Sequence, residues 1–143
     1  MKRLVFLILP FLLLPSYSFA QSFGDYEGAV YIRNYDGDTI TFNLPGLHPI
    51  IGEKISIRVN GIDTPEIRGK CDQEKHNAKQ AKAMVTDILK DAEQITLKNM
   101  ERGKYFRIAA DVYVDGENLA DVLIEAGMAV RYDGGKKTQK WCE

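Results

Sequence analysis

The segment EGAVYIRNYDGDTITFNL, residues 27–44, contains the pattern that decides the fold. Two runs of alternating apolar and polar residues, 27–35 and 38–44, flank the pair Asp36 and Gly37. An Asp-Gly pair between two such runs is a strong hairpin signal, because both residues tolerate the backbone of a tight turn. The segment therefore predicts two antiparallel strands.

Three further segments extend this pattern toward the middle of the chain. Residues 54–60 have apolar side chains at every second position, which predicts a third strand. Residues 45–52 hold two prolines and two glycines and predict a loop. Between 72 and 92 the apolar residues recur every three or four positions, which predicts an amphipathic helix with Asp72 as its N-cap.

The remaining elements indicate the fold class. Residues 94–100 and 105–114 predict two more strands, and residues 119–126 predict a short helix that ends at Gly127. Five strands with a helix between the third and the fourth fit a mainly β, α+β protein built on a five-stranded barrel of the oligonucleotide-binding type. An open α+β sheet is the alternative.

The first twenty residues have the layout of a secretory signal peptide. Lys2 and Arg3 precede a run, 4–14, that is apolar except at Pro10, and Ser-Phe-Ala at 18–20 forms a small-x-small cleavage site. The run is too short to span a bilayer well, which disfavours an uncleaved anchor. We expect residues 1–20 to be removed, residues 21–143 to form one domain with no membrane contact, and the protein to be periplasmic or secreted.

Charge and cysteine content narrow the class of protein. The chain has 19 basic and 20 acidic residues, and loss of Lys2 and Arg3 would make the net charge −3, which excludes a strongly basic nucleic-acid binder but not a local basic patch. In an oxidising compartment Cys71 and Cys142 would tend to pair and would fasten Trp141 to the start of the helix. Two free thiols are the alternative. Neither histidine lies at zinc-finger spacing from the cysteines.

Charged residues gather in three clusters where strand patterning does not require them: residues 36–39, 58–66 and 104–107. Asp38 and Asp63 are hard oxygen ligands, and the carbonyl of Thr64 adds a third, a set that suits calcium. Glu66 follows directly. Two arginines provide planar guanidinium groups suited to a phosphodiester; they are Arg58 and Arg107.

These clusters carry a resemblance to a known family. The chain resembles the staphylococcal nuclease (thermonuclease) family in the order and spacing of four stretches: DGDT at 36–39, IRVNGIDTPE at 57–66, KYFR at 104–107 and NLADVLIEAGMA at 118–129. The resemblance implies an oligonucleotide-binding-type barrel and a calcium-dependent phosphodiesterase that cuts DNA and RNA at the P–O5′ bond and leaves 3′-phosphates. It implies Asp38, Asp63 and Thr64 as calcium ligands, and as catalytic residues Arg58, Glu66 and Arg107.

Substrate contacts are predicted at Lys104, Tyr105 and Tyr132, where the two tyrosines would stack on bases unless they are ordinary barrel packing. Two basic faces would extend this surface, unless they are simply solvated: Arg68, Lys70, Lys75, Lys79 and Lys82 form the first, and Lys136, Lys137 and Lys140 the second. We expect a monomer without a protein partner. A binding module of the same fold without turnover and an envelope protein with a vestigial site are the competing hypotheses.

Overall fold

The computed structural model describes residues 23–103 and 107–142 and contains the predicted hairpin. Strand β2 (Val30–Asn34) pairs antiparallel with β3 (Thr39–Asn43), and residues 35–38 connect them. β3 then pairs antiparallel with β4 (Ile55–Val59), so that Thr39 lies opposite Arg58. This register brings the end of the 36–39 turn next to an arginine at the centre of the sheet.

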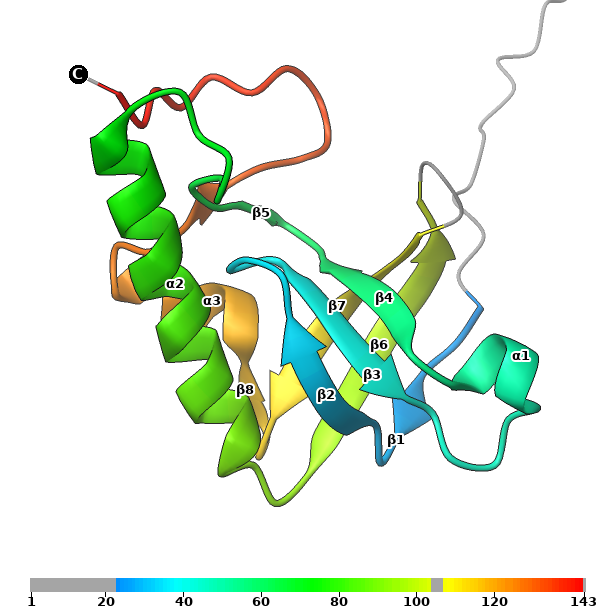
Figure 1. The fold of residues 1–143 in the computed structure, drawn as a ribbon. Helices are drawn as coiled ribbons and strands as arrows, with labels where there is room; N and C mark the ends of the chain where they lie inside the picture. Colours follow the sequence, from blue (N-terminus) through cyan, green and yellow to red (C-terminus); the bar gives the residue numbers. More distant parts are fainter. Residues whose placement is uncertain (1–22, 104–106, 143) are drawn as a thin grey trace, which may run out of the picture.

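The other long strands complete a curled sheet (Figure 1). Its strand order is β1-β6-β7-β4-β3-β2, with β4 and β7 parallel. β1 and β2 are consecutive in the chain yet lie at opposite ends of that order. The segment from 26 to 34 therefore pairs with β6 through β1 and with β3 through β2, which curls the sheet into a barrel-like form. The strands not yet delimited are β1 (Tyr26–Glu27), β6 (Ile95–Arg102), β7 (Ile108–Val114) and β8 (Glu117–Asn118), which pairs with β7.

Three helices stand among the described residues: α1 (Pro49–Gly52), α2 (Asp72–Lys90) and α3 (Leu119–Glu125). α1 lies inside the stretch predicted to be a loop; Pro49 suits a first helical position, where no backbone N–H is needed. The predicted N-cap Asp72 is wrong, because Cys71 has the extended backbone of the cap and its Sγ accepts from Glu74 N. The mixed α+β, barrel-like fold itself is confirmed.

The core lies between the concave face of the sheet and two helices. α2 packs along β2 and α3 against β7 (Figure 1). The inward side chains of the central strands are fully buried, among them Ile40, Phe42, Ile57, Leu97 and Val112. The apolar residues whose alternation predicted these strands are therefore the ones buried on one face of the sheet.

The C-terminal segment returns to the start of α2. Short strands β5 (Ile62–Asp63) and β9 (Val130–Arg131) pair, and the chain then crosses to a disulfide between Cys71 and Cys142, with Cα atoms 5.9 Å apart. Trp141 beside it is half-buried and does not reach the main core. In the described parts of the chain, no helix is long and apolar enough to cross a bilayer.

Candidate active site

The turn at residues 36–39 is fixed by its own side chains. Asp36 Oδ1 accepts from the backbone N–H groups of Thr39, at 2.8 Å, and of Asp38, at 3.2 Å. Gly37 lies close to its neighbours, because a Cβ there would stand 2.9 Å from Thr64 Cγ2 and 3.1 Å from Ala81 Cβ. The turn is thus held from within and pressed between two other elements, so Asp38 occupies a defined position.

The predicted ligands Asp38, Asp63 and Thr64 lie together and are all buried. Asp38 Oδ2 accepts from Thr64 N at 3.2 Å and from Thr64 Oγ1 at 3.0 Å. Asp63 ends β5, whose pairing with β9 holds it beside the cleft. Two carboxylates and the Thr64 backbone from segments 26 residues apart therefore form one cluster, the arrangement that an oxygen-preferring cation needs.

Arg58 bridges the two predicted carboxylate ligands. Its guanidinium forms a close ion pair with Asp38, lies 3.7 Å from Asp63 Oδ1, and donates to the carbonyl of Ile62 at 3.0 Å. The side chain is 20% exposed, and burial lowers the pKa of Arg58, while the charges of Asp63 and Asp36 act in the opposite direction. The Arg58 guanidinium is thus fixed by contacts with three residues.

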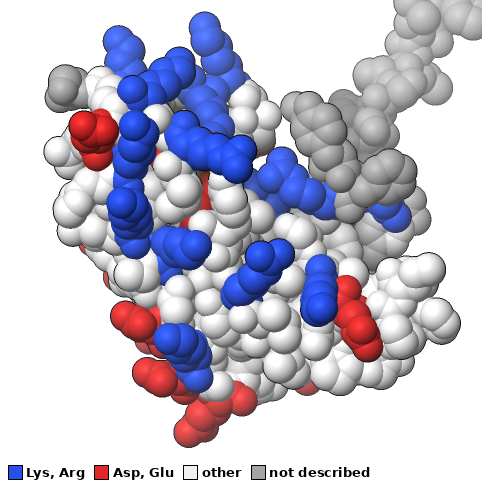
Figure 2. Space-filling model, in the orientation of Figure 1, with Lys and Arg blue, Asp and Glu red and all other residues white. Residues whose placement is uncertain are grey.

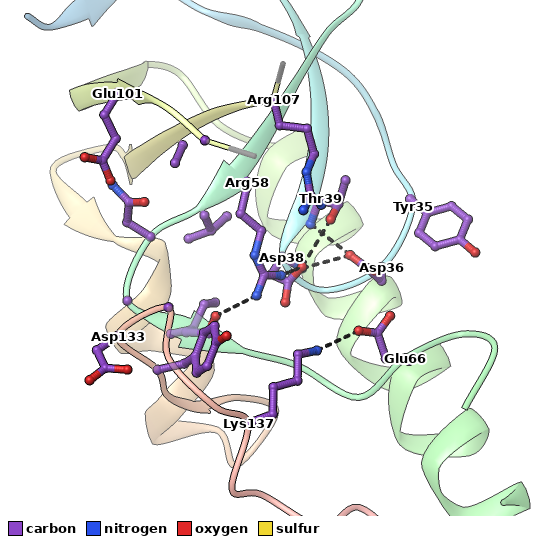
Figure 3. Close-up of a pocket in the computed structure, with 18 residues that line it drawn as sticks. Tyr35, Asp36, Asp38, Thr39, Arg58, Glu66, Glu101, Arg107, Asp133 and Lys137 are labelled. Atoms are coloured by element: carbon purple, nitrogen blue, oxygen red, sulfur yellow. Dashed lines mark hydrogen bonds and ion pairs between the residues drawn. The ribbon is translucent and has the colours of Figure 1, made fainter. Parts of the chain in front are cut away.

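Arg107 and Glu66 line the same cleft and come from different segments of the chain (Figure 3). Arg107 precedes β7 and points toward the turn with Asp36 and Asp38. Its charge contributes to the lowered pKa of Arg58, so the two guanidinium groups are electrostatic neighbours. Glu66 is half-exposed at the mouth of the cleft. The cleft of about 590 Å³ therefore combines all three predicted catalytic side chains.

Of the three predicted substrate contacts, the structure describes only Tyr132. Tyr132 lines the cleft; its N–H donates to the carbonyl of Gly61 and its hydroxyl donates to the carbonyl of Gly135 at 2.6 Å. Lys104 and Tyr105 lie outside the described residues. Their roles remain predictions.

Lys137 reaches the cleft from the C-terminal segment (Figure 3). Its Nζ lies 2.7 Å from Asp63 Oδ1 and 2.8 Å from Glu66 Oε1. Partial burial lowers the pKa of Lys137, but the contacts with the two carboxylates outweigh it and the pKa is raised. Sequence reasoning placed this lysine only in a basic face. No local pattern marks it, because its partner Glu66 is 71 residues away.

Two further acidic residues shape the site and were not among the predicted site residues. Burial raises the pKa of Asp36, against the hydrogen bond from Thr39, and the charge of Glu66 adds to the rise. Glu74 on α2 is 7% exposed, and its carboxylate accepts from the backbone N–H of Lys70 at 2.8 Å and of Glu66 at 3.4 Å. Glu74 therefore supports the loop that carries Glu66. The Asp-Gly-Asp spacing could have indicated Asp36; the inward turn of Glu74 has no sequence signal.

Comparison with known proteins agrees with this geometry. Residues 56–141 match the family model described as "Staphylococcal nuclease homologue", a range that includes Arg58, Asp63 and Glu66. The chain is also 29% identical over 97 residues to "Staphylococcal-like nuclease CAN1" of Arabidopsis thaliana. That alignment covers 64% of this chain and 27% of the relative, so the chain spans about a quarter of the relative's length. The matched range exceeds half of the chain, and the protein belongs to the staphylococcal nuclease family.

Proposed function

We propose that this protein is a calcium-dependent nuclease that hydrolyses DNA and RNA with little sequence preference and leaves 3′-phosphate ends. One observation carries the proposal: Arg58 bridges Asp38 and Asp63 in a cleft that Glu66 and Arg107 also line. Two guanidinium groups beside a carboxylate cluster suit a phosphodiester, whose charge increases as a nucleophile attacks phosphorus. Family membership supports the same reaction class.

The donor set fits a divalent cation. Asp38 and Asp63 provide buried carboxylates. Within the described residues, Asp63 Oδ1 accepts no hydrogen bond of normal geometry, and its near neighbour is the Lys137 ammonium group, which forms an ion pair with it at 2.7 Å. An ammonium group already stands at this oxygen, which indicates that the position attracts cations. Asp38, Asp63 and the carbonyl of Thr64 would hold calcium, which would polarise a phosphoryl oxygen and offset its developing charge.

The chain's own residues supply the remaining steps. Glu66 takes a proton from the water that attacks phosphorus, as a general base. Lys137 Nζ shares Glu66 Oε1 and has to move before that oxygen can accept a proton. Arg58 and Arg107 stabilise the charge on the five-coordinate phosphorus, and Arg107 also assists the leaving oxygen.

The test is hydrolysis of single-stranded DNA by the purified protein, first with calcium and then with excess chelator. We expect cleavage only with calcium, 3′-phosphate ends, and no metal-dependent activity in a folded Asp38→Ala variant. Asp87→Ala, on the exposed surface of α2, is the matched control and should retain activity. Full activity in Asp38→Ala would contradict the metal assignment. DNA binding without cleavage under all conditions would favour the non-catalytic binding module.

Export from the cytoplasm is part of the proposal. Residues 1–20 lie outside the described range, and the Cys71–Cys142 disulfide supports an oxidising compartment. We expect the mature protein to begin at Gln21 and to be a monomer in the periplasm or outside the cell. N-terminal sequencing of protein from the producing cell tests the cleavage site, and sedimentation tests the oligomeric state.

A further inference from the structure

A second groove adjoins the active-site cleft. It has a volume of about 510 Å³ and lies between residues 66–70 and residues 137–142. Glu66 and Lys137 line both the groove and the cleft, so the two spaces meet at this ion pair. A bound polymer that leaves the cleft past Glu66 therefore enters the groove.

The two walls of the groove are fastened together at one end. Cys71 caps α2 immediately after the first wall, and its disulfide partner Cys142 ends the second wall. Lys70 and Trp141, the residues next to these cysteines, both line the groove. The disulfide therefore keeps the walls of the groove side by side.

The side chains that line the groove carry an excess of positive charge. The cationic side chains that line it are Arg68, Lys70, Lys137 and Lys140. Three carboxylates also line it. The Glu74 carboxylate is buried and accepts from two backbone N–H groups of the first wall, whereas Asp63 and Glu66 both pair with Lys137. Asp72 points to solvent and lies 3.4 Å from Lys75. The acidic residues that interrupt this stretch in the sequence thus leave its positive charge largely exposed.

The face of the molecule that Figure 2 draws shows a separation of charge. Figure 2 shows Lys and Arg side chains gathered over the first turns of α2 and the adjoining C-terminal segment, whereas Asp and Glu gather at the other end of α2. A protein without net positive charge has therefore concentrated cations around this groove. Such a patch attracts polyanions independently of their sequence.

We propose that the groove binds the backbone phosphates of a single nucleic-acid strand beyond the scissile phosphate, and so holds long substrates more tightly than short ones. This inference rests on the proposed nuclease function. Arg and Lys contacts to phosphates fix position without reading bases. Trp141, which also lines the groove, offers an aromatic surface for a base, and its indole Nε1 is buried without a hydrogen-bond partner in the described part of the chain.

Oligothymidylate binding without catalysis tests the groove. Trp141 is the single tryptophan of the chain, so its fluorescence reports on this place alone. In excess chelator, an oligothymidylate of about 12 nucleotides should change the Trp141 emission and bind far more tightly than a dinucleotide. No change on binding of the longer strand, or equal affinity for both lengths, would overturn the proposal.

Matched variants test which cationic side chains bind the nucleic-acid strand. In the Arg68→Ala/Lys140→Ala double variant, the affinity for the longer strand should fall about tenfold at low salt, and the slope of log affinity against log salt should decrease by about 1.4 for two lost cations. Lys90→Ala, at the acidic end of α2, is the control and should leave the affinity unchanged. Unchanged affinity in the double variant, or an equal loss in Lys90→Ala, would overturn the proposal.

Calcium-dependent cleavage of the dinucleotide separates this proposal from the function on which it rests. The double variant should cleave the dinucleotide at the rate of the unmodified protein, because neither residue lines the cleft. Cleavage by both proteins with unchanged long-strand binding would reject the groove and leave the nuclease function intact. Absence of cleavage in the unmodified protein would reject the nuclease function, and the groove would still be judged by the binding data.

Discussion

The turn at residues 36–39 and the C-terminal segment 133–142 both bring charged side chains to one cleft, but they are held in opposite ways. The turn is buried, hydrogen-bonded to itself and pressed between Thr64 and Ala81. Residues 133–140 are all exposed, and the segment is fastened by a disulfide at its end and by Lys137 in the cleft. The turn suits a fixed ligand, whereas the segment suits a cation that can leave.

Removal of the disulfide should have the largest effect, because it separates the segment from α2 and leaves the turn intact. In Cys71→Ser/Cys142→Ser the unfolded chain regains the freedom of a loop that spans 71 positions, so the free energy of unfolding should fall by about 4 kcal/mol in the chain-entropy model. Urea unfolding with and without reductant measures this. Non-reducing peptide mapping checks the Cys71–Cys142 link first. An oxidised protein no more stable than the double variant would contradict the prediction.

Substitution of Arg58 tests the rigid side of the comparison. By analogy with the loss of an oxyanion donor, Arg58→Ala should lower turnover about 100- to 1000-fold. Because Arg58→Ala also removes the ion pair of the buried Asp38 carboxylate, while Asp63 keeps Lys137, Arg58→Lys is the second variant; it keeps the charge but not the planar fork. Arg33→Ala, exposed on β2, should retain turnover. Single-turnover kinetics on folded samples decide, and near-normal rates in both Arg58 variants would remove Arg58 from the mechanism.

A single methyl group compares the packing of the two regions directly. Gly37→Ala places a Cβ 2.9 Å from Thr64 Cγ2, so we expect a loss of about 1–3 kcal/mol in the free energy of unfolding. Gly135→Ala meets only the side chain of Asp133, at 3.2 Å, and should cost far less. Thermal and urea denaturation of the two variants measure the difference. Equal losses would mean that the turn is no more constrained than the segment.

The hairpin, the third strand and the long helix were predictable because their burial repeats with the period of the element. Ile40 and Phe42 are buried at alternate positions of β3, and the apolar face of α2 recurs every three or four residues. The division of residues 26–34 into two strands was not predictable in this way. Gly28, with φ +78°, turns the chain there, and the pairing of β1 with β6 depends on a strand about 70 residues away.

The same distinction applies to the site. Asp38 and Arg58 lie in sequence motifs, and the hairpin register that places Thr39 opposite Arg58 brings them together. Lys137 and Glu74 have no motif. Lys137 depends on where an aperiodic segment is fastened, and Glu74 depends on unpaired N–H groups in a neighbouring loop. The positions of Lys137 and Glu74 in the site therefore depend on long-range contacts of irregular segments, which local sequence patterns do not indicate.

Lys137→Ala should have the smallest effect, and it sharpens the comparison most. Its ammonium group and a divalent cation require the same carboxylate, Asp63, so removal of the lysine should tighten metal binding. A half-exposed ion pair contributes about 1 kcal/mol or less, which corresponds to a gain of about fivefold at most. Calorimetric titration with calcium in the absence of nucleic acid measures it. Lys136→Ala removes the same charge from the same segment and should change the affinity less, since Lys136 does not line the cleft. Equal gains in the two variants would mean that Lys137 acts only through general charge, whereas a gain confined to Lys137→Ala would identify it as a cation that the metal displaces.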